Sequence, residues 1–207
     1  MEGVPDPDSP PLAEVAALVL AAGGSSRFGV ENKLLHRWQG RALLEHVVEA
    51  IDTSAVARSL VVTGYQHACI DAVLTRRSPP LDSVHNADWA SGLASSLVRG
   101  VSALQDHPAI LVCLGDMPWL QGALIDTLLR AAAQCPERWM VVPVHGGRRG
   151  NPVLIRQALY PAVLALQGDA GARVLAARQP ERVREVAVET VGVLLDVDTQ
   201  QDAERLR

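Results

Sequence analysis

Charged residues follow an apolar run near the start of the chain, and their types suit the binding of phosphate. Arg27 and Lys33 come soon after the apolar run 16–22 and the small residues 23–26. A buried strand that ends in glycines presents backbone N–H groups at one point, and N–H groups together with cations bind phosphate. The stretch 16–35 therefore predicts a phosphate-binding loop around which the rest of the chain is organised.

This loop fits neither of two common phosphate-binding patterns. A P-loop requires Lys and then Ser or Thr directly after its second glycine, whereas Val30 and Glu31 follow Gly29. The dinucleotide fingerprint requires three spaced glycines, whereas Gly23 and Gly24 are adjacent and no third glycine completes the pattern. The residues alone leave a second interpretation open, a glycine-rich turn with two solvated cations.

Asp116 comes directly after the clearest buried strand of the sequence, AILVCLG at 109–115. Ligands of an open parallel sheet bind beyond the carboxyl ends of its strands, so we expect Asp116 at the same edge as the phosphate loop. A carboxylate there suits Mg²⁺, which takes one or two carboxylates together with phosphate oxygens and waters. Capping of the following helix is the alternative role, and the nearby phosphate loop favours the metal.

Two further carboxylates, Asp196 and Asp198, close the last apolar run in LLDVDTQQD. The alternation of a strand places both on one face. Asp196 follows the apolar run directly and is favoured as the second metal ligand, with Asp198 left as the alternative. In a purely structural interpretation Asp196 is solvated and Asp198 caps the terminal helix, a role that Thr199 is also predicted to fill. With Arg27, Lys33 and Asp116, this group suits attack at a nucleotide α-phosphate, where cations neutralise the developing charge. An incoming phosphate is itself an ionised nucleophile, so no Ser/His/Asp arrangement is needed.

Other polar positions suit the remaining parts of two substrates. In NADWASGLASSLVRG, Gly92, Ser95 and Ser96 open a predicted helix, where they suit contact with a ribose or base edge, or plain helix capping. In GGRRGNP, Arg148 and Arg149 lie on a glycine-flanked hairpin loop. They suit an anionic second substrate, although hairpin arginines are often exposed without a function.

Two more side chains have both a functional and a structural interpretation. Asp169 opens a helix in GDAGARVL and suits either a hydrogen bond to a pterin-like heterocycle or a helix cap. Trp89 suits stacking on a ligand or a place at the edge of the core. The six histidines are scattered along the sequence, and we interpret them as structural or surface residues.

Apolar runs that alternate with helical patterns predict an α/β fold, with a mostly parallel sheet between two layers of helices. The leader 1–13 is acidic and rich in proline and is expected to be flexible, and 14–207 is expected to form a single domain. The segment 145–180 is interpreted as an insertion that could form a lid. Strands are predicted at 15–21, 59–64, 82–86, 109–115, 139–144, 152–155, 183–188 and 191–197. Helices are predicted at 41–51, 67–75, 93–104, 122–134, near 156–166 and 169–178, and from Thr199.

Composition excludes several classes of function. A net charge of −4 without a basic patch argues against nucleic acid as a partner. Cys69, Cys113 and Cys135 are widely spaced, so they predict reduced thiols and neither zinc nor disulfides. The acidic N-terminus lacks the basic start of a signal peptide, and no apolar run approaches the length that spans a membrane. We therefore expect a cytoplasmic protein that binds no membrane.

Taken in order, several motifs resemble those of the molybdenum cofactor cytidylyltransferases, within the wider MobA-like nucleotidyltransferase superfamily. The motifs are LAAGGSSRFG with a following lysine, VVTGY, HNADWASGLASSL, GDMP, RRGNPV, GDAGAR and LLDVDTQQD. The resemblance implies a three-layer Rossmann-like fold of the nucleotide-diphospho-sugar transferase type. It also implies Mg²⁺-dependent transfer of CMP from CTP to molybdopterin bearing molybdenum, with release of pyrophosphate. A recipient molybdoenzyme or its chaperone is then an expected partner.

The resemblance also assigns site residues, with Arg27 and Lys33 on the phosphates and catalytic together with Asp116. It makes Asp116 a metal ligand and Asp196 the second ligand of the same metal ion. LAAG resembles the cytidylyl branch, whereas the guanylyl branch usually has LAGG. Asn151 stands where the cytidylyl branch commonly has His. Expected nucleotide contacts are Leu20, Ala21, Ala22, Gly23, Gly24, Ser25, Arg27, Lys33, Gly64, Gly92, Ser95 and Ser96, and expected second-substrate contacts are Arg148, Arg149, Asn151 and Asp169.

Two other functions remain open at this point. One is a related transferase that uses another nucleotide or another phosphorylated acceptor, such as a sugar or an isoprenoid precursor. The other is a binding protein that holds the molybdenum cofactor for an apo-enzyme and catalyses nothing. Nucleotide-dependent release of pyrophosphate separates the enzymes from the binding protein.

Overall fold

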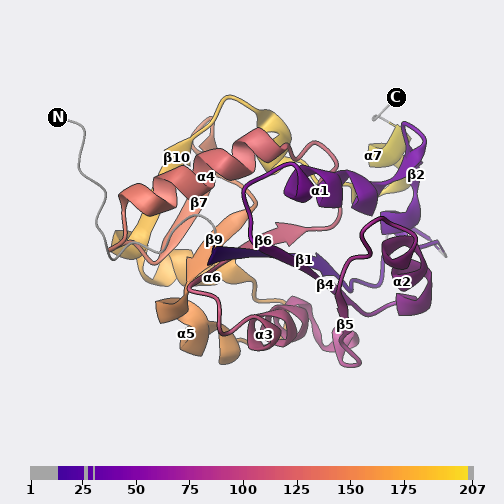
Figure 1. Ribbon diagram of the computed structural model, residues 1–207, viewed down its shortest axis with the longest axis horizontal. Helices are drawn as coiled ribbons and strands as arrows, with labels where there is room; N and C mark the ends of the chain where they lie inside the picture. Colours follow the sequence, from indigo (N-terminus) through magenta and orange to yellow (C-terminus); the bar gives the residue numbers. More distant parts are fainter. Residues whose placement is uncertain (1–13, 26–27, 30, 205–207) are drawn as a thin grey trace.

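The computed structural model describes residues 14–25, 28–29 and 31–204. Its centre is an eight-stranded sheet with the order β10-β7-β9-β6-β1-β4-β5, in which β8 pairs with β7 (Figure 1). Strands β6, β1, β4 and β5 pair in parallel, as do β10 and β7, whereas β9 is antiparallel to both of its neighbours. The strands are β1 Val15–Ala21, β4 Arg58–Thr63, β5 Ser83–His85, β6 Ala109–Leu114, β7 Met140–His145, β8 Arg148–Arg149, β9 Val153–Arg156 and β10 Val183–Ala187.

The central strand β1 is buried on both faces, as its continuous apolar run predicts. Ala17, Val19 and Ala21 contribute to one hydrophobic core, whereas Leu18 and Leu20 contribute to the core on the other side of the sheet. Because successive side chains of a strand point to opposite faces, only one of these two sets can face a ligand that binds on a given side.

Helices cover both faces of the sheet, which confirms the predicted three-layer α/β architecture. Helices α1 and α4 lie over one face, and α3, α5 and α6 lie over the other (Figure 1). No helix among the described residues is both long and apolar enough to cross a membrane. The helices are α1 Leu43–Asp52, α2 His67–Thr75, α3 Leu93–Ala103, α4 Gly122–Gln134, α5 Tyr160–Leu164, α6 Ala172–Arg178 and α7 Gln200–Glu204.

Gly100 lies in the middle of α3, where glycine normally weakens a helix. A Cβ atom at this position would lie 2.3 Å from Cδ1 of Leu18, which is fully buried. The missing side chain therefore lets α3 approach the central strand closely.

The predicted late strand 191–197 is wrong. Val191–Leu194 form a short 3-10 helix, η6, whose first turn is capped when the Thr190 hydroxyl accepts a hydrogen bond from the N–H of Gly192. The carbonyl of Val193 accepts from the N–H of Asn151 at 2.8 Å, in a loop contact outside the sheet. The apolar run correctly predicts buried residues here, but its backbone groups form hydrogen bonds with loop residues and not with a neighbouring β-strand.

The segment 145–180 is an integral part of the fold, so its interpretation as an insertion is also wrong. β9 lies inside the sheet between β7 and β6, and α5 and α6 bury Tyr160, Val163 and Leu175 in the core. The first helix starts at Leu43 and not at 41, because residues 41–42 form β3 and pair with β2 at 37–38. The predicted flexible leader, 1–13, lies outside the described residues.

Candidate active site

Asp116 lies just beyond the carboxyl end of β6, beside the end of β1. The N–H of Gly115 donates to the carbonyl of Leu20 at 3.1 Å, which extends the contact between the two strands by one residue. A Cβ on Gly115 would lie 3.2 Å from that same oxygen, so glycine allows the close approach. The strand ends therefore bring Asp116 to the loop after β1, as the sequence predicts.

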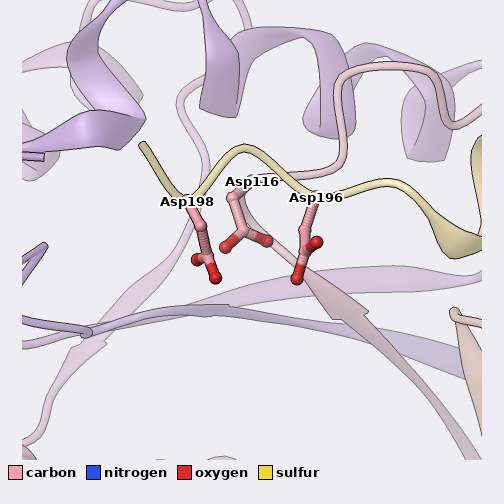
Figure 2. A group of neighbouring side chains, drawn as sticks. All are labelled: Asp116, Asp196 and Asp198. Atoms are coloured by element: carbon pink, nitrogen blue, oxygen red, sulfur yellow. The ribbon is translucent and has the colours of Figure 1, made fainter. Parts of the chain in front are cut away.

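A single backbone hydrogen bond brings the last loop of the chain to Asp116. The N–H of Val197 donates to the carbonyl of Asp116 at 3.0 Å. Asp196 and Asp198 flank Val197, and their carboxylates point to the same place as that of Asp116 (Figure 2). One carboxylate oxygen from each of the three residues lies within 4.8 Å of the other two.

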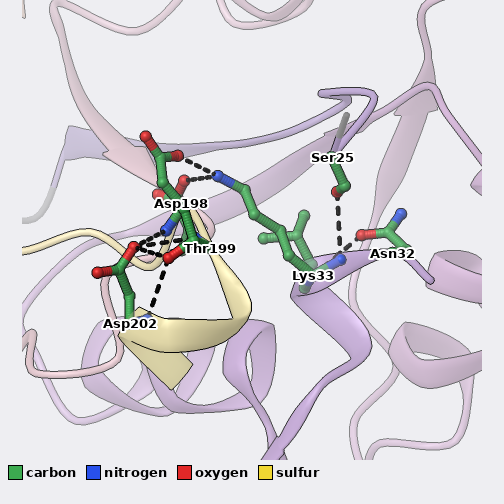
Figure 3. Close-up of polar contacts among 8 residues, drawn as sticks. Ser25, Asn32, Lys33, Asp198, Thr199 and Asp202 are labelled. Carbon is green, nitrogen blue, oxygen red and sulfur yellow. Dashed lines mark hydrogen bonds and ion pairs between the residues drawn. The ribbon is translucent and has the colours of Figure 1, made fainter. Parts of the chain in front are cut away.

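Asp198 is held in place by the start of α7. The carboxylate of Asp202 accepts from the N–H groups of Asp198 at 3.3 Å and Thr199 at 2.9 Å, and the Thr199 hydroxyl accepts from the N–H of Asp202 at 3.1 Å (Figure 3). Such a reciprocal cap satisfies backbone groups that a helix start leaves unpaired. Thr199 therefore caps α7 as predicted, but Asp198 is not the cap and belongs to the carboxylate group.

Lys33 places its ammonium between two of these carboxylates. Its Nζ lies 2.6 Å from Oδ2 of Asp116 and 2.8 Å from Oδ1 of Asp198, and its side chain is 14% exposed. Asn32 accepts from the N–H of Leu34 and so caps the 3-10 helix η2, Lys33–Leu35. The Ser25 hydroxyl accepts from the N–H of Lys33 at 3.1 Å, which fixes the lysine to the loop after β1 (Figure 3).

The charges of this group are strongly coupled. Burial lowers the pKa of Lys33, but the carboxylates of Asp116 and Asp198 outweigh burial, so the pKa lies above its usual value. Asp196 is exposed at the cavity surface, and partial loss of hydration raises its pKa, which the charges of Asp116 and Asp198 raise further. With three ionised carboxylates and one ammonium, the described site carries a net charge of −2, which a divalent cation would balance.

The residues present fit such a cation. Among the described side chains, Oδ1 of Asp116 is a buried carboxylate oxygen that makes no hydrogen bond. A buried acceptor without a donor is costly, and a metal ion removes that cost. Oxygen ligands from two or three carboxylates are the donors that Mg²⁺ or Mn²⁺ prefers. Asp116, Asp196 and Asp198 would hold the ion.

A cavity of about 650 Å³ opens beside this group, on the α3 side of the sheet. Ala21 points to the opposite core and lies outside its lining. Ser25 and Gly64 are also outside the lining, as is Ser95, so these four predicted nucleotide contacts are not brought to the cavity wall. The predicted residues that line it are Leu20, Ala22, Gly23, Gly24, Lys33, Gly92, Ser96, Asp116, Asp169 and Asp196, together with Asp198.

A second cavity of about 300 Å³ meets the first at Asp196 and Asp169, which line both. Its walls are largely apolar, and Asn151 and Arg173 stand among the polar groups that line it. Asp169 reaches both cavities because the loop before α6 packs on the start of α3. There a Cβ on Gly92 would lie 2.4 Å from the carbonyl oxygen of Gly168.

The hairpin arginines lie elsewhere. Arg148 is exposed on β8, and Arg149 pairs with Glu185 on β10 at 2.6 Å. Neither is among the residues that line the two cavities. Arg27, predicted to bind phosphate, lies outside the described residues.

Three residues support the site in roles that the sequence analysis does not assign or, for Asp198, does not favour. Asp198 supplies a carboxylate, Asn32 orients Lys33, and the buried Asn86 bonds to the first turns of α3. Asn32 precedes a short helical segment and is readable as a helix cap. The roles of the other two depend on contacts between segments distant in sequence, which the local pattern does not contain.

Comparison with known proteins identifies a family and two relatives with different named activities. Residues 17–183 match the MobA-like NTP transferase domain. The chain is 33% identical to a protein named nicotine blue oxidoreductase from Paenarthrobacter nicotinovorans, over 93% of this chain and 96% of the relative. It is 28% identical to the molybdenum cofactor cytidylyltransferase of Escherichia coli, over 92% of this chain and 94% of that enzyme.

A solved structure with the same fold is that of Rv0371c from Mycobacterium tuberculosis in complex with manganese. Its TM-score to this chain is 0.79 at 23% identity, and the superposition covers 93% of this chain and 97% of that one. This likeness shows that the two chains share their fold.

Proposed function

This chain belongs to the MobA-like NTP transferase family, and from that premise we propose that it transfers CMP from CTP to a molybdopterin-bound molybdenum cofactor and releases pyrophosphate. The resident metal in this proposal is Mg²⁺, held by Asp116 and Asp196 with Asp198. The product would pass to a molybdoenzyme or its chaperone. The observation that carries the proposal is the ammonium of Lys33 between two carboxylates in the lining of a cavity of about 650 Å³.

The proposed reaction needs no strong general acid or base. A phosphate oxygen of the acceptor attacks the α-phosphorus of CTP, a new P–O bond forms, and the bond from the α-phosphorus to the bridging oxygen breaks as pyrophosphate leaves. The acceptor phosphate is already ionised near neutral pH. A bound divalent cation supplies charge neutralisation on the phosphate oxygens. Lys33 adds a positive charge at the same place and is held there by Ser25 and Asn32.

The two joined cavities support a reaction with two substrates. The larger one contains the glycine loop 23–24, Trp89 and Lys33, which suit a nucleoside triphosphate. The smaller one has an apolar lining with Asn151 and Asp169 at polar positions, which suits a flat heterocycle. The carboxylate of Asp196 lines both, so the reacting phosphates of the two substrates would meet at the carboxylate group.

The choice of CTP and of the molybdenum cofactor rests on the LAAG motif and on the cytidylyltransferase relative. Asn151 and Asp169 are the residues we assign to the acceptor. Arg148 and Arg149 stay a prediction, because Arg149 is already paired with Glu185 and neither arginine lines a cavity.

A pyrophosphate assay tests the proposal. The protein is incubated with Mg²⁺, molybdopterin carrying molybdenum, and CTP, GTP, ATP or UTP in turn. We expect pyrophosphate and a cytidylylated cofactor, identified by mass, with CTP alone. Release with another nucleotide, or with another phosphorylated acceptor, corrects the substrate and keeps the reaction class. Cofactor binding without turnover, unchanged by Asp116→Asn, supports the chaperone alternative instead.

The relative named nicotine blue oxidoreductase supplies a second candidate function, a redox reaction of that dye. Its identity of 33% over almost the whole chain is the observation in favour. The discriminating experiment mixes the protein with nicotine blue and a reduced electron donor and follows the visible absorbance of the dye. Loss of colour that depends on the protein, without nucleotide-dependent pyrophosphate release, replaces the transferase proposal.

A further inference from the structure

Asn86 joins the end of β5 to the first turns of α3 and is buried, with 5% of its surface exposed. Its N–H donates to the carbonyl of Thr63 at 2.7 Å, which ties it to the end of β4. Its side-chain Oδ1 accepts from the N–H of Asp88 at 3.0 Å. Because a backbone N–H can only donate, this bond fixes which end of the amide is the NH₂ group.

The NH₂ group of Asn86 then donates to two neighbouring hydroxyls, Ser95 at 2.8 Å and Ser96 at 3.0 Å. The two serines differ in where their own protons go. The Ser95 hydroxyl donates to the carbonyl of Gly92 at 2.8 Å or of Asp88 at 3.1 Å, so its hydrogen bonds are completed within the protein. Ser95 is therefore a structural residue.

Ser96 is 4% exposed and lines the larger cavity. It accepts from Asn86, and within the described part of the chain no acceptor for its own proton is seen. A hydroxyl has one proton, and a donor that already occupies its oxygen turns that proton elsewhere. The proton of Ser96 is thus available to an acceptor atom of a ligand in the cavity.

Trp89 indicates which part of a bound nucleotide would lie beside Ser96. Its indole packs directly on backbone, since a Cβ on Gly24 would lie 2.8 Å from Cζ3 of the ring and a Cβ on Gly64 2.6 Å from Cβ of Trp89. Trp89 also lines the cavity, which makes it a rigid aromatic wall. Such a wall suits a base, because every base has a face that stacks on aromatic rings.

Along the edge of the sheet, one strand lies between Trp89 and the carboxylate group. Asp116 follows β6 and Gly64 follows β4, with β1 between them. Strands lie about 4.8 Å apart, so the two ends are roughly 10 Å apart. A nucleotide whose α-phosphate is at the carboxylates therefore extends its nucleoside toward Trp89 and Ser96.

We propose that Asn86 is a positioning residue that fixes the Ser96 hydroxyl as a hydrogen-bond donor to the nucleoside half of the bound triphosphate, beside the stacking wall of Trp89. The proposal rests on the proposed function, since it takes a nucleoside triphosphate as the ligand. It assigns to Ser96 a contact that Ser95, the next residue in sequence, does not make.

Calorimetric titration with two probes in the presence of Mg²⁺ tests this. CTP carries a nucleoside, and inorganic tripolyphosphate carries the charge without one. We expect Ser96→Ala to weaken CTP about tenfold, the effect of one lost hydrogen bond, and to leave tripolyphosphate unchanged. Asn86→Asp places an acceptor against Ser96 and is expected to have the same selective effect. Ser95→Ala is the matched control and leaves both affinities unchanged.

Ser96→Ala that binds CTP like the wild type overturns the proposal, as does an equal loss for CTP and tripolyphosphate. Wild-type protein that binds tripolyphosphate as tightly as CTP also overturns it. Melting temperatures show that the variants are folded, and Ser96→Ala stands as the decisive variant if Asn86→Asp does not fold. CTP that binds with the expected pattern but yields no pyrophosphate refutes the proposed reaction and leaves this inference in place.

Discussion

Removal of the ammonium of Lys33 should destabilise the metal-free protein strongly. Lys33→Met keeps the length of the side chain but leaves Asp116 and Asp198 without their cation. The side chains of Lys33 and Asp116 are 14% and 15% exposed, so their ion pair is largely shielded from water. Loss of one partner of a buried pair costs about 3–5 kcal/mol, and partial exposure of Asp198 favours the lower figure.

A loss of about 3 kcal/mol in the free energy of unfolding lowers the melting temperature of a chain of this size by about 6–12 °C. Calorimetry with a chelator at neutral pH measures it. The matched control is Arg58→Met, which removes the cation of an ion pair with Asp82 whose side chains are 50% and 68% exposed. Exposed pairs contribute about 0–1 kcal/mol, so the control should melt close to the wild type.

Added Mn²⁺ gives the second half of this test. In the wild type an incoming ion competes with the ammonium of Lys33, whereas in Lys33→Met it meets three carboxylates with no competitor. We therefore expect Mn²⁺ to raise the melting temperature more in the variant than in the wild type. The reasoning is refuted if Lys33→Met costs no more than Arg58→Met, or if Mn²⁺ stabilises both proteins equally.

Three further predictions concern the site and the core. Asp116→Asn should lower the rate of pyrophosphate release about 10²–10³-fold while circular dichroism shows an unchanged fold, and an unaltered rate would remove Asp116 from the mechanism. Asp196 has a raised pKa in the folded protein, so its ionisation disfavours folding above that pKa. Asp196→Asn should therefore melt higher than the wild type without metal at neutral pH, and the difference should vanish as the pH falls through the raised pKa to the ordinary one; a constant difference contradicts this. Gly100→Ala should cost about 1–2 kcal/mol in chemical denaturation because its methyl group meets the buried Leu18, whereas Gly23→Ala, with no atom within 4 Å of the added Cβ, should be neutral.

The sequence predicts the framework of the site because strand ends determine it. The strand at 15–21 and the helix at 122–134 have the predicted bounds, and the architecture is confirmed. Asp116 meets the loop that carries Lys33 because the carboxyl ends of parallel strands share one edge. The local sequence pattern is enough to predict a segment whose backbone hydrogen bonds are made within a helix or between neighbouring strands.

The same reasoning fails where backbone partners lie in loops. The apolar run 191–197 has the composition of a strand, but the partners of Val193 and Val197 are the loop residues Asn151 and Asp116. Asp198 therefore joins the carboxylates, although its sequence position indicates a cap. Ser96 lines the cavity and Ser95 does not. The sequence does not predict this difference, because the two serines are adjacent at the start of the same predicted helix.

Lys33 is the only lysine in the sequence. Growth on lysine labelled with ¹⁵N at Nζ would thus give a protein with one labelled side-chain amine, and that amine lies between Asp116 and Asp198. A single nuclear magnetic resonance peak would then report directly on the carboxylate group of the candidate site. Its shift on addition of Mg²⁺, nucleotide or acceptor would show the order in which they arrive.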